Sequence, residues 1–308
     1  MTEKTIDILS VGDVNVEITL TNLASMPKLG REILAENAYR TLGGSTVNTA
    51  VGCARMGLAS AFVGKVGRDG DGDYLTEKLR DLGVDPSHML RDDSAPTGIT
   101  VSLATAGDRA MVTCLGAIGT LTADEITDEL LKCARHLHVA GYFLQNALRP
   151  SLPALFDRAH ALGLTVSLDT GWDDSERWEG VKELLGKTDI FFPNESEAAA
   201  ITGESDFYAA AEKLSRLVPT AVVKHGPHGA VLRRGSELLE RPAYPGKPVD
   251  TTGAGDAFNA GFLGAYLRGL APDTCLRWGL ASGSISVTRP GSAASCPTLD
   301  EVRALVGG

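Results

Sequence analysis

The most chemically suggestive stretch of this chain is VDTTGAGDAFNAGFLGAYL, residues 249–267. Phe258, Phe262 and Tyr266 recur every four positions, and this spacing predicts a helix from about Ala257 with one buried face. The residues GAGD then stand at the first turn of that helix. N–H groups at a helix start have no intrahelical partner and lie at the positive end of the helix dipole. The stretch therefore predicts a site for an anion.

Four residues of this turn fit the transfer of a phosphoryl group. Gly253, Ala254 and Gly255 are small enough to let a phosphate approach the backbone closely. Asp256 would lie beside that phosphate, where its carboxylate can take the proton of an attacking hydroxyl while the N–H groups stabilise the transferring group. On the residues alone, the alternative is a plain glycine turn in which Asp256 only favours the helix start.

Apolar strands and helices alternate along most of the chain, which favours a parallel sheet covered by helices on both sides. A helix is predicted from Thr46 to Gly57, and two more follow in residues 152–163 and 206–218. His136 and His138 alternate along one strand, and we interpret them as structural residues. The predicted strands are residues 6–12, 60–67, 136–141, 165–169, 189–194 and 221–226.

Two segments interrupt this alternation. Residues 97–116 alternate with period two on either side of AGD, which predicts a β-hairpin. Residues 18–39 are also strand-like and rich in turn residues. Together they predict a small antiparallel sheet, a lid inserted at about residues 15–40 and 97–116 of a single domain that spans residues 1–308.

The composition excludes several classes of protein. The chain has 308 residues, 43% hydrophobic, and a formal net charge of -10, so extended contact with nucleic acid is not expected. It has no apolar run of membrane-spanning length and no signal-peptide pattern at its start, so we expect a cytoplasmic protein without membrane contact. The five cysteines are scattered and suggest neither disulfides nor a zinc site.

Two motifs, taken in order, resemble the signatures of the ribokinase-like (PfkB) carbohydrate kinases. The C-terminal signature, DTxGAGD followed by an apolar helix, is matched at residues 250–256. The N-terminal signature resembles GGSTVNTAVGCARMG, which contains Gly43, Gly44 and Asn48. The resemblance covers most of the chain and implies a three-layer α/β/α kinase domain with a small β-sheet lid.

The resemblance also implies binding sites for ATP and Mg²⁺. Asn194 and Glu197 match the NxxE segment, which organises water around Mg²⁺ and the nucleotide phosphates. The segment VVKHGPHGAVL resembles the strand and turn that line the nucleotide, with Lys224, His225, Gly226 and Gly229 as the matching residues. The segment ISVTRPGSAASCP resembles the loop that holds a monovalent cation such as K⁺ in ribokinase-like members. The cation ligands so implied are Asp250, Thr252, Ser286, Arg289, Gly291 and Ser295, several through backbone carbonyls.

The substrate site shows departures from ribokinases. Glu17 stands where they have an aspartate, and Tyr142 falls about where they have a substrate-binding glutamate, so ribose is not favoured. The substrate-site candidates are Asp13, Asn15, Glu17, Gly43, Gly44, Asn48 and Tyr142.

The resemblance implies an ATP-dependent sugar kinase, with Asp256 as the general base for a primary hydroxyl and the GAG turn as the anion hole. One alternative is a nucleoside kinase of the same family, for which Tyr39 is the main aromatic candidate to stack on a base. Another is a catalytically silent ligand-binding protein, against which the intact Asp256 argues. The exposed sheet of the lid needs cover, so we expect it to close over the sugar or to pair with a second copy in a homodimer.

Overall fold

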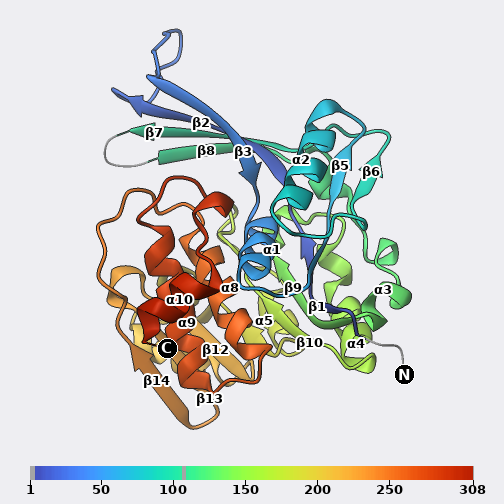
Figure 1. Cartoon of the computed structure of the whole chain (residues 1–308), viewed down its shortest axis with the longest axis vertical. Helices are drawn as coiled ribbons and strands as arrows, with labels where there is room; N and C mark the ends of the chain where they lie inside the picture. Colours follow the sequence, from blue (N-terminus) through green and yellow to red (C-terminus); the bar gives the residue numbers. More distant parts are fainter. Residues whose placement is uncertain (1–3, 106–108, 308) are drawn as a thin grey trace.

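A computed structural model describes residues 4–105 and 109–307 of the chain. Its larger sheet has eight strands with helices on both faces, and a second sheet projects from one end (Figure 1). In spatial order the strands of the main sheet are β14 (Glu237–Arg241), β13 (Ala230–Arg234), β12 (Thr220–Lys224), β11 (Ile190–Phe191), β10 (Thr165–Leu168), β9 (Ala134–Ala140), β1 (Ile6–Gly12) and β4 (Ser60–Val63). This confirms the predicted three-layer α/β/α architecture.

Alternating side chains on the central strands explain the three layers. Ile8 and Val222 pack on one face, while Leu9 and Val223 pack on the other. The first face is covered by α1 (Ser45–Arg55), α8 (Ala254–Tyr266), α9 (Pro272–Ser286) and α10 (Leu299–Val306). The second face is covered by α3 (Asp128–Lys132), α4 (Leu152–Ala161), α5 (Val181–Leu185), α6 (Glu195–Thr202) and α7 (Phe207–Leu214).

The alternating pattern predicted a parallel main sheet, but the sheet is mixed. The strands from β4 to β12 run parallel, but β12, β13 and β14 pair antiparallel. The short turn from Gly226 to Gly229 joins β12 to β13, and a connection of this length can only reverse the chain. The prediction was therefore wrong at this edge of the sheet.

The single strand predicted for residues 60–67 is also divided. β4 belongs to the main sheet, whereas β5 (Lys65–Gly67) pairs with β6 (Leu90–Asp92). The break falls at Gly64, where an added Cβ would lie 2.4 Å from the ring of Phe62. β5 then leads into α2 (Gly70–Asp81), which packs below the lid.

The lid is a four-stranded sheet in the order β3, β2, β7, β8. Its strands are β2 (Asn15–Leu23), β3 (Asn37–Gly43), β7 (Ile99–Thr105) and β8 (Arg109–Cys114). The two hairpins are antiparallel, as predicted, but β2 and β7 pair in parallel, because both inner strands run outward from the main domain. Residues 106–108, which form the AGD turn of the predicted hairpin, lie outside the described residues.

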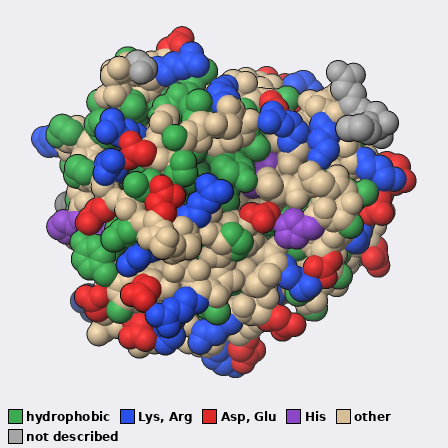
Figure 2. All heavy atoms as spheres, turned by 90° about the horizontal axis from the view of Figure 1, so that it is seen from below, with side chains coloured by type: hydrophobic (Ala, Val, Ile, Leu, Met, Phe, Trp, Pro, Cys, Tyr) green, Lys and Arg blue, Asp and Glu red, His purple; other side chains and the backbone are tan. Residues whose placement is uncertain are grey.

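Charges of both signs share the face opposite the lid. Viewed from below, Lys and Arg side chains are interspersed with Asp and Glu, and hydrophobic side chains gather on one part of the face (Figure 2). No helix in the described part of the chain is long and apolar enough to cross a membrane.

Candidate active site

The glycine turn of residues 253–255 forms the start of α8. Gly253 is the N-cap residue, with a left-handed φ of 73° that glycine adopts without strain. This conformation lets the helix begin at Ala254, three residues before the predicted Ala257. Among the described residues, the N–H groups of Gly255 and Asp256 have no acceptor. The start of α8 therefore offers backbone donors without an acceptor, the kind of group that can bind an anion.

Asp256 lies in the first turn of α8 and is only 9% exposed. Ser45 Oγ donates to its Oδ1 at 2.6 Å, and Asn48 Nδ2 donates to its Oδ2 at 3.0 Å. Both partners belong to α1, which lies against α8. Burial, and then the charge of Asp169, raise the pKa of Asp256 to about 7. A carboxyl group with such a pKa can accept and release a proton near neutral pH.

A second buried cluster adjoins this carboxylate. Lys224 Nζ lies 2.8 Å from Asp169 Oδ2, and Asn259 Nδ2 donates to the same oxygen at 2.7 Å. Burial opposes the charged forms of both ionic groups, but their mutual attraction raises the pKa of Lys224 and lowers that of Asp169. Lys224 also lies close to the glycine turn, since an added Cβ at Gly255 would be 3.2 Å from its Nζ. The ammonium group of Lys224 therefore lies between the glycine turn and Asp169.

Asn194 and Glu197 form a capping box at the start of α6. Asn194 Oδ1 accepts the N–H of Glu197 at 2.9 Å, and Glu197 Oε2 accepts the N–H of Asn194 at 2.9 Å. Burial, and then the nearby charge of Asp169, raise the pKa of Glu197. Asp169 and Glu197 thus share one lysine, and the excess of negative charge fits a hydrated divalent cation.

The turn after β12 holds the other residues that were predicted to line the nucleotide. Gly226 and Gly229 have positive φ values of 51° and 114°. The ring of His225 stacks on Phe207 with centroids 4.2 Å apart, and its Nε2 lies 2.8 Å from Glu195 Oε2. The structure brings Lys224 into the Asp256 cluster but places the His225 side chain against α6 and α7.

Asp13 joins the first strand to the paired glycines. Its carboxylate accepts the N–H groups of Ser45 and Thr46, each at 2.9 Å, at the start of α1. Gly44 has a φ of 119° and packs on the Asp13 carboxylate, where a Cβ would come within 3.1 Å of Oδ2. Asp13 therefore fixes the loop that carries Ser45 to Asp256.

Asn15, Glu17 and Gly43 lie together at the root of the lid. An added Cβ at Gly43 would come within 3.1 Å of both side chains. Asn15 Nδ2 donates to Thr100 Oγ1 at 2.9 Å, and burial raises the pKa of Glu17. Tyr142 is buried, and its hydroxyl donates to the carbonyl of Glu179, so its side chain does not join this group.

The two segments predicted to hold a monovalent cation lie side by side. Asp250 Oδ2 accepts the N–H of Gly291 at 3.0 Å, and Asp250 Oδ1 accepts the Thr252 hydroxyl at 2.6 Å. The side chains of the other implied ligands have partners of their own: Ser286 with Gly283, Arg289 with Glu301, and Ser295 with Ser292. Arg289 can therefore bind a cation only through its backbone carbonyl, whereas the two serines keep hydroxyl lone pairs as well as their carbonyls.

Arg109 reaches from the lid to the same place. Its guanidinium donates to Thr252 Oγ1 and lies 3.6 Å from Asp250 Oδ1. The lid hairpin therefore contacts the segment that leads directly into the glycine turn.

The model for the pfkB family carbohydrate kinases matches residues 5–299. The chain belongs to this family. An ATP-dependent ribose-1-phosphate kinase from Halopiger xanaduensis is 31% identical over 303 residues, which are 97% of each chain. A 2-dehydro-3-deoxygluconokinase from Bacillus subtilis is 30% identical over 280 residues, 85% of each chain. The structure of Arabidopsis thaliana ribokinase complexed with ribose and ATP has a TM-score of 0.85, 27% identity and 99% coverage of both chains.

Five residues in or beside this candidate site were not among those predicted from the sequence. Ser45, Asp169, Asn259 and Arg109 contact the predicted residues directly. Gln145 is the fifth: it is 1% exposed, and its Nε2 lies over Gly12 beside the Asp13 loop. Within the described part of the chain, neither side-chain polar atom of Gln145 has a partner, and the buried Asn48 carboxamide oxygen also has none. Ser45 and Asn259 stand within the two signatures, but only their placement on facing helices shows what they contact.

Proposed function

We propose that the protein transfers the γ-phosphoryl group of ATP to a primary hydroxyl of a small carbohydrate. One observation carries the proposal: a buried carboxylate, Asp256, lies in the first turn of a helix whose first N–H groups have no acceptor among the described residues. Phosphoryl transfer needs a base for the acceptor hydroxyl and hydrogen-bond donors for the phosphate, and this turn provides both.

In this proposal Asp256 is the general base. Asn48 and Ser45 hold its carboxylate from α1, and a pKa near 7 lets it take a proton from the acceptor hydroxyl. The N–H groups of Gly255 and Asp256, together with Gly253 and Ala254 as the close-approach turn, receive the charge of the transferring group. Lys224 adds a positive charge on the same side.

We place Mg²⁺ beside Asn194, Glu197 and Asp169. When bound, the ion would neutralise charge on the nucleotide phosphates. Asn194 and Glu197 hold each other in the capping box and fix the orientation of the Glu197 carboxylate. We assign a monovalent cation such as K⁺ to the loop of Asp250 and Gly291, where the two segments already meet.

We assign acceptor binding to the residues around the Asp13 loop. Asn48 Oδ1 and the Gln145 carboxamide are buried and lack partners among residues 4–105 and 109–307, so a bound polyol could satisfy them. Asn15, Glu17 and the Gly43 and Gly44 backbone close the same region below the lid. Tyr142 is the weakest of the predicted contacts, because its hydroxyl is already bonded to Glu179.

We also propose that the whole chain works as one kinase domain and that its lid pairs with a second copy. Large hydrophobic side chains are exposed on the lid, where a partner sheet would cover them. They are Leu29, Leu34, Tyr39, Met111 and Val112. Sedimentation velocity would show a dimer that Val112→Lys dissociates, whereas an unchanged dimer would place the interface elsewhere.

A nucleoside kinase of the same fold is the second candidate. The structure of adenosine kinase from Sinorhizobium meliloti has a TM-score of 0.81 and 27% identity to this chain. Tyr39 is 53% exposed on the lid, in a position open to stacking. The third candidate, a silent ligand-binding protein, leaves the raised pKa of Asp256 without a use.

The test is ADP release from Mg-ATP over a panel of sugars, sugar phosphates, sugar acids and nucleosides. We expect turnover with one sugar, and a fall in kcat of about 10²–10⁴-fold in Asp256→Asn. Asp81→Asn, an exposed change on α2, is the matched control and should retain full activity. Turnover with nucleosides alone would favour the second candidate, and ATP binding without any turnover would favour the third.

A further inference from the structure

A cavity of about 250 Å³ lies far from the catalytic edge of the sheet. Ile190 and Thr220, which line it, are the first residues of β11 and β12, whereas Asn194 and Lys224 stand at the opposite ends of these strands. The cavity opens between the sheet and the connection from α8 to α9. It is thus separate from the Asp256 site.

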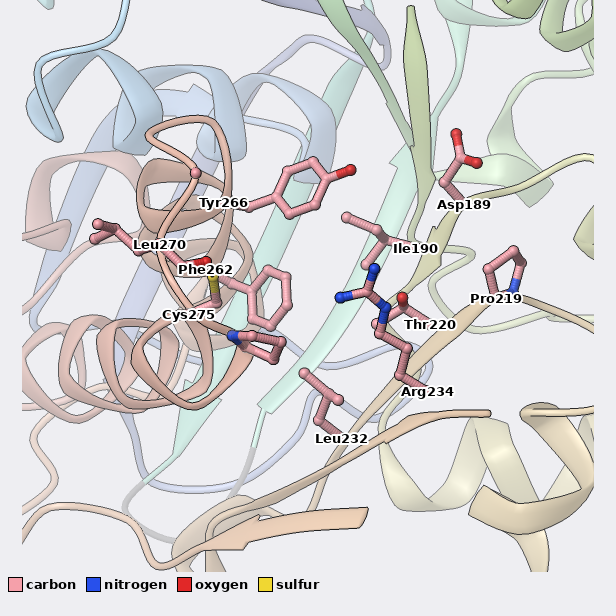
Figure 3. Close-up of a pocket in the computed structure, with 12 residues that line it drawn as sticks. Asp189, Ile190, Pro219, Thr220, Leu232, Arg234, Phe262, Tyr266, Leu270 and Cys275 are labelled. Carbon is pink, nitrogen blue, oxygen red and sulfur yellow. Dashed lines mark hydrogen bonds between the residues drawn. The ribbon is translucent and has the colours of Figure 1, made fainter. Parts of the chain in front are cut away.

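The walls of this cavity combine an apolar surface with two polar groups. Leu232 and Phe262 contribute apolar surface, and Figure 3 shows the Arg234 guanidinium and the Tyr266 hydroxyl both projecting toward Ile190. Within the described residues, the side chain of Arg234, an exposed residue, has neither a hydrogen bond nor an ion pair. An apolar pocket with a few converging polar groups is the usual form of a small-molecule site.

One acidic residue also lines the cavity, and one of its two carboxylate oxygens is already engaged. Asp189 Oδ2 accepts the N–H of Val166 at 2.7 Å and lies 2.9 Å from His160 Nε2. Arg234 is the cationic group in the lining of the cavity, and its partner should be an anion such as a carboxylate.

Tyr266 connects the cavity to a row of buried polar groups between the sheet and α8. Its ring meets that of His136 edge to face, with centroids 6.0 Å apart, and burial raises the pKa of its hydroxyl, a rise that the nearby Thr165 hydroxyl opposes. From Thr165 Oγ1 the row continues to His136 Nδ1 at 2.7 Å, from His136 Nε2 to Ser167 Oγ at 2.7 Å, and from Ser167 Oγ to His138 Nδ1 at 2.8 Å. We call Tyr266, Thr165, His136, Ser167 and His138 the hydroxyl–imidazole chain.

The far end of this chain lies beside the active site. His138 is fully buried, its Nε2 has no partner among the described residues, and the charges of Asp169 and Lys224 act on its pKa. Burial lowers the pKa of His136 to about 3 and that of His138 to about 4, so both rings are neutral at physiological pH. The buried chain therefore joins a wall of the cavity to the surroundings of the Lys224–Asp169 pair.

The hydroxyl–imidazole chain has two self-consistent arrangements. Each neutral imidazole has one N–H and one acceptor nitrogen, and each hydroxyl has one proton, so every donor must point the same way along the chain. If Tyr266 donates inward to Thr165, His138 carries its proton on Nε2, facing the active site. If Tyr266 donates outward, to a ligand, His138 carries it on Nδ1 and presents a lone pair instead. The two arrangements contain the same number of protons.

We propose that this cavity is a second binding site, for a small molecule in which an apolar body carries one carboxylate, and that its occupancy is communicated to the active site through the hydroxyl–imidazole chain. Arg234 binds the carboxylate, and the Tyr266 hydroxyl donates to it. A ligand that accepts from Tyr266 favours the outward arrangement, so it shifts the population of the two states.

Binding can be tested with benzoate by saturation-transfer NMR on the full chain. We expect binding that persists at saturating ATP and weakens about tenfold or more in Arg234→Ala. Arg233→Ala, the adjacent arginine on the opposite face of β13, is the matched control and should bind benzoate like the wild type. Benzyl alcohol, the neutral counterpart, should bind equally weakly to both arginine variants. Displacement of benzoate by ATP, undiminished binding to Arg234→Ala, or no binding at all would overturn the proposed site.

Communication needs a separate test. Tyr266→Phe removes only the hydroxyl, so it should still bind benzoate through Arg234. In the wild type, benzoate should change kcat/KM severalfold, whereas in Tyr266→Phe it should not. An equal effect in both proteins, or no effect in the wild type despite binding, would overturn the role of the chain. These outcomes are separate from the identity of the acceptor sugar, because the binding assay requires no turnover.

Discussion

Lys224 Nζ and Asp169 Oδ2 lie 2.8 Å apart, and their side chains are only 13% and 7% exposed, so an unpaired charge at either would be costly. Lys224 ends β12 and Asp169 follows β10, two parallel strands that flank β11 in the sheet. Because the carboxyl ends of these strands meet at the same edge, residues 55 positions apart in sequence form one ion pair. Asn259 of α8 binds the same carboxylate and ties the pair to the helix that carries Asp256.

The first prediction concerns this ion pair. Lys224→Met leaves Asp169 buried and uncompensated, so the free energy of unfolding at pH 7 should fall by about 3–5 kcal/mol. The double variant Lys224→Met/Asp169→Asn removes both charges and should recover a large part of that loss. Urea unfolding of the four proteins of the cycle gives the coupling directly. If the double variant lost the sum of the two single losses, the pair would not be coupled.

The second prediction concerns the hydrogen bond from Ser45 to Asp256. The hydroxyl stabilises the ionised carboxylate, so Ser45→Ala should raise the pKa of Asp256 above about 7. A base must be deprotonated to act, so kcat/KM should rise with pH and level off near this pKa, and the midpoint should move up by about 1 pH unit in the variant.

The pH profile distinguishes this effect from a general loss of structure. Ser60→Ala is the matched control, because its buried hydroxyl bonds to the Ala50 carbonyl on the same helix α1 and does not contact Asp256. Its midpoint should stay at that of the wild type. A lower kcat in Ser45→Ala with an unmoved midpoint would show that Ser45 does not act through the ionisation of Asp256.

Local pattern predicted much of the fold, because the strands and helices of the main domain are strongly apolar and end at turn residues. The spacing of Phe258, Phe262 and Tyr266 indicated α8, but it predicted a start at Ala257. Hydrophobic periodicity does not reveal the left-handed conformation of Gly253, which lets the helix begin earlier. Strand direction at β13 and the parallel pairing of β2 with β7 depend on which strands meet, and this is a property of the whole fold.

Candidate site residues could be predicted where they stand within a family signature. They could not be predicted where only folding brings them close to the signature residues. Asp256 stands within the signature, whereas Asp169 follows an ordinary apolar strand and shows its partner only in three dimensions. His136 and His138 are buried and hydrogen-bonded, as a structural interpretation requires. Their connection to Tyr266 could not be foreseen, because it depends on the rotation of α8 over the sheet.

The third prediction links the pKa of Asp256 to stability. Its folded pKa of about 7 is above the value of about 3.9 expected in an unfolded chain. The folded state therefore binds this proton more tightly, and its contribution to stability is full below pH 4 and is lost as the pH rises through 7. Asp256→Asn cannot ionise, so its advantage over the wild type should widen by about 2–3 kcal/mol between pH 5 and pH 8. Urea unfolding at the two pH values measures this gap, and parallel stability curves would contradict the assignment.

The fourth prediction concerns the contact of the lid with the active site. Arg109 bonds to Thr252 and lies near Asp250, so it holds the lid against the segment that precedes the glycine turn. Arg109→Ala should raise the KM for the sugar about tenfold, since one charge-assisted hydrogen bond and a partly exposed ion pair are lost. The KM for ATP should change less than twofold, because the Lys224 and Asn194 segments are untouched. Arg40→Ala is the matched control: Arg40 is also on the lid but pairs with Asp71 on α2. An equal rise in KM for both variants would show that any weakening of the lid suffices, and that Arg109 has no special place at the acceptor site.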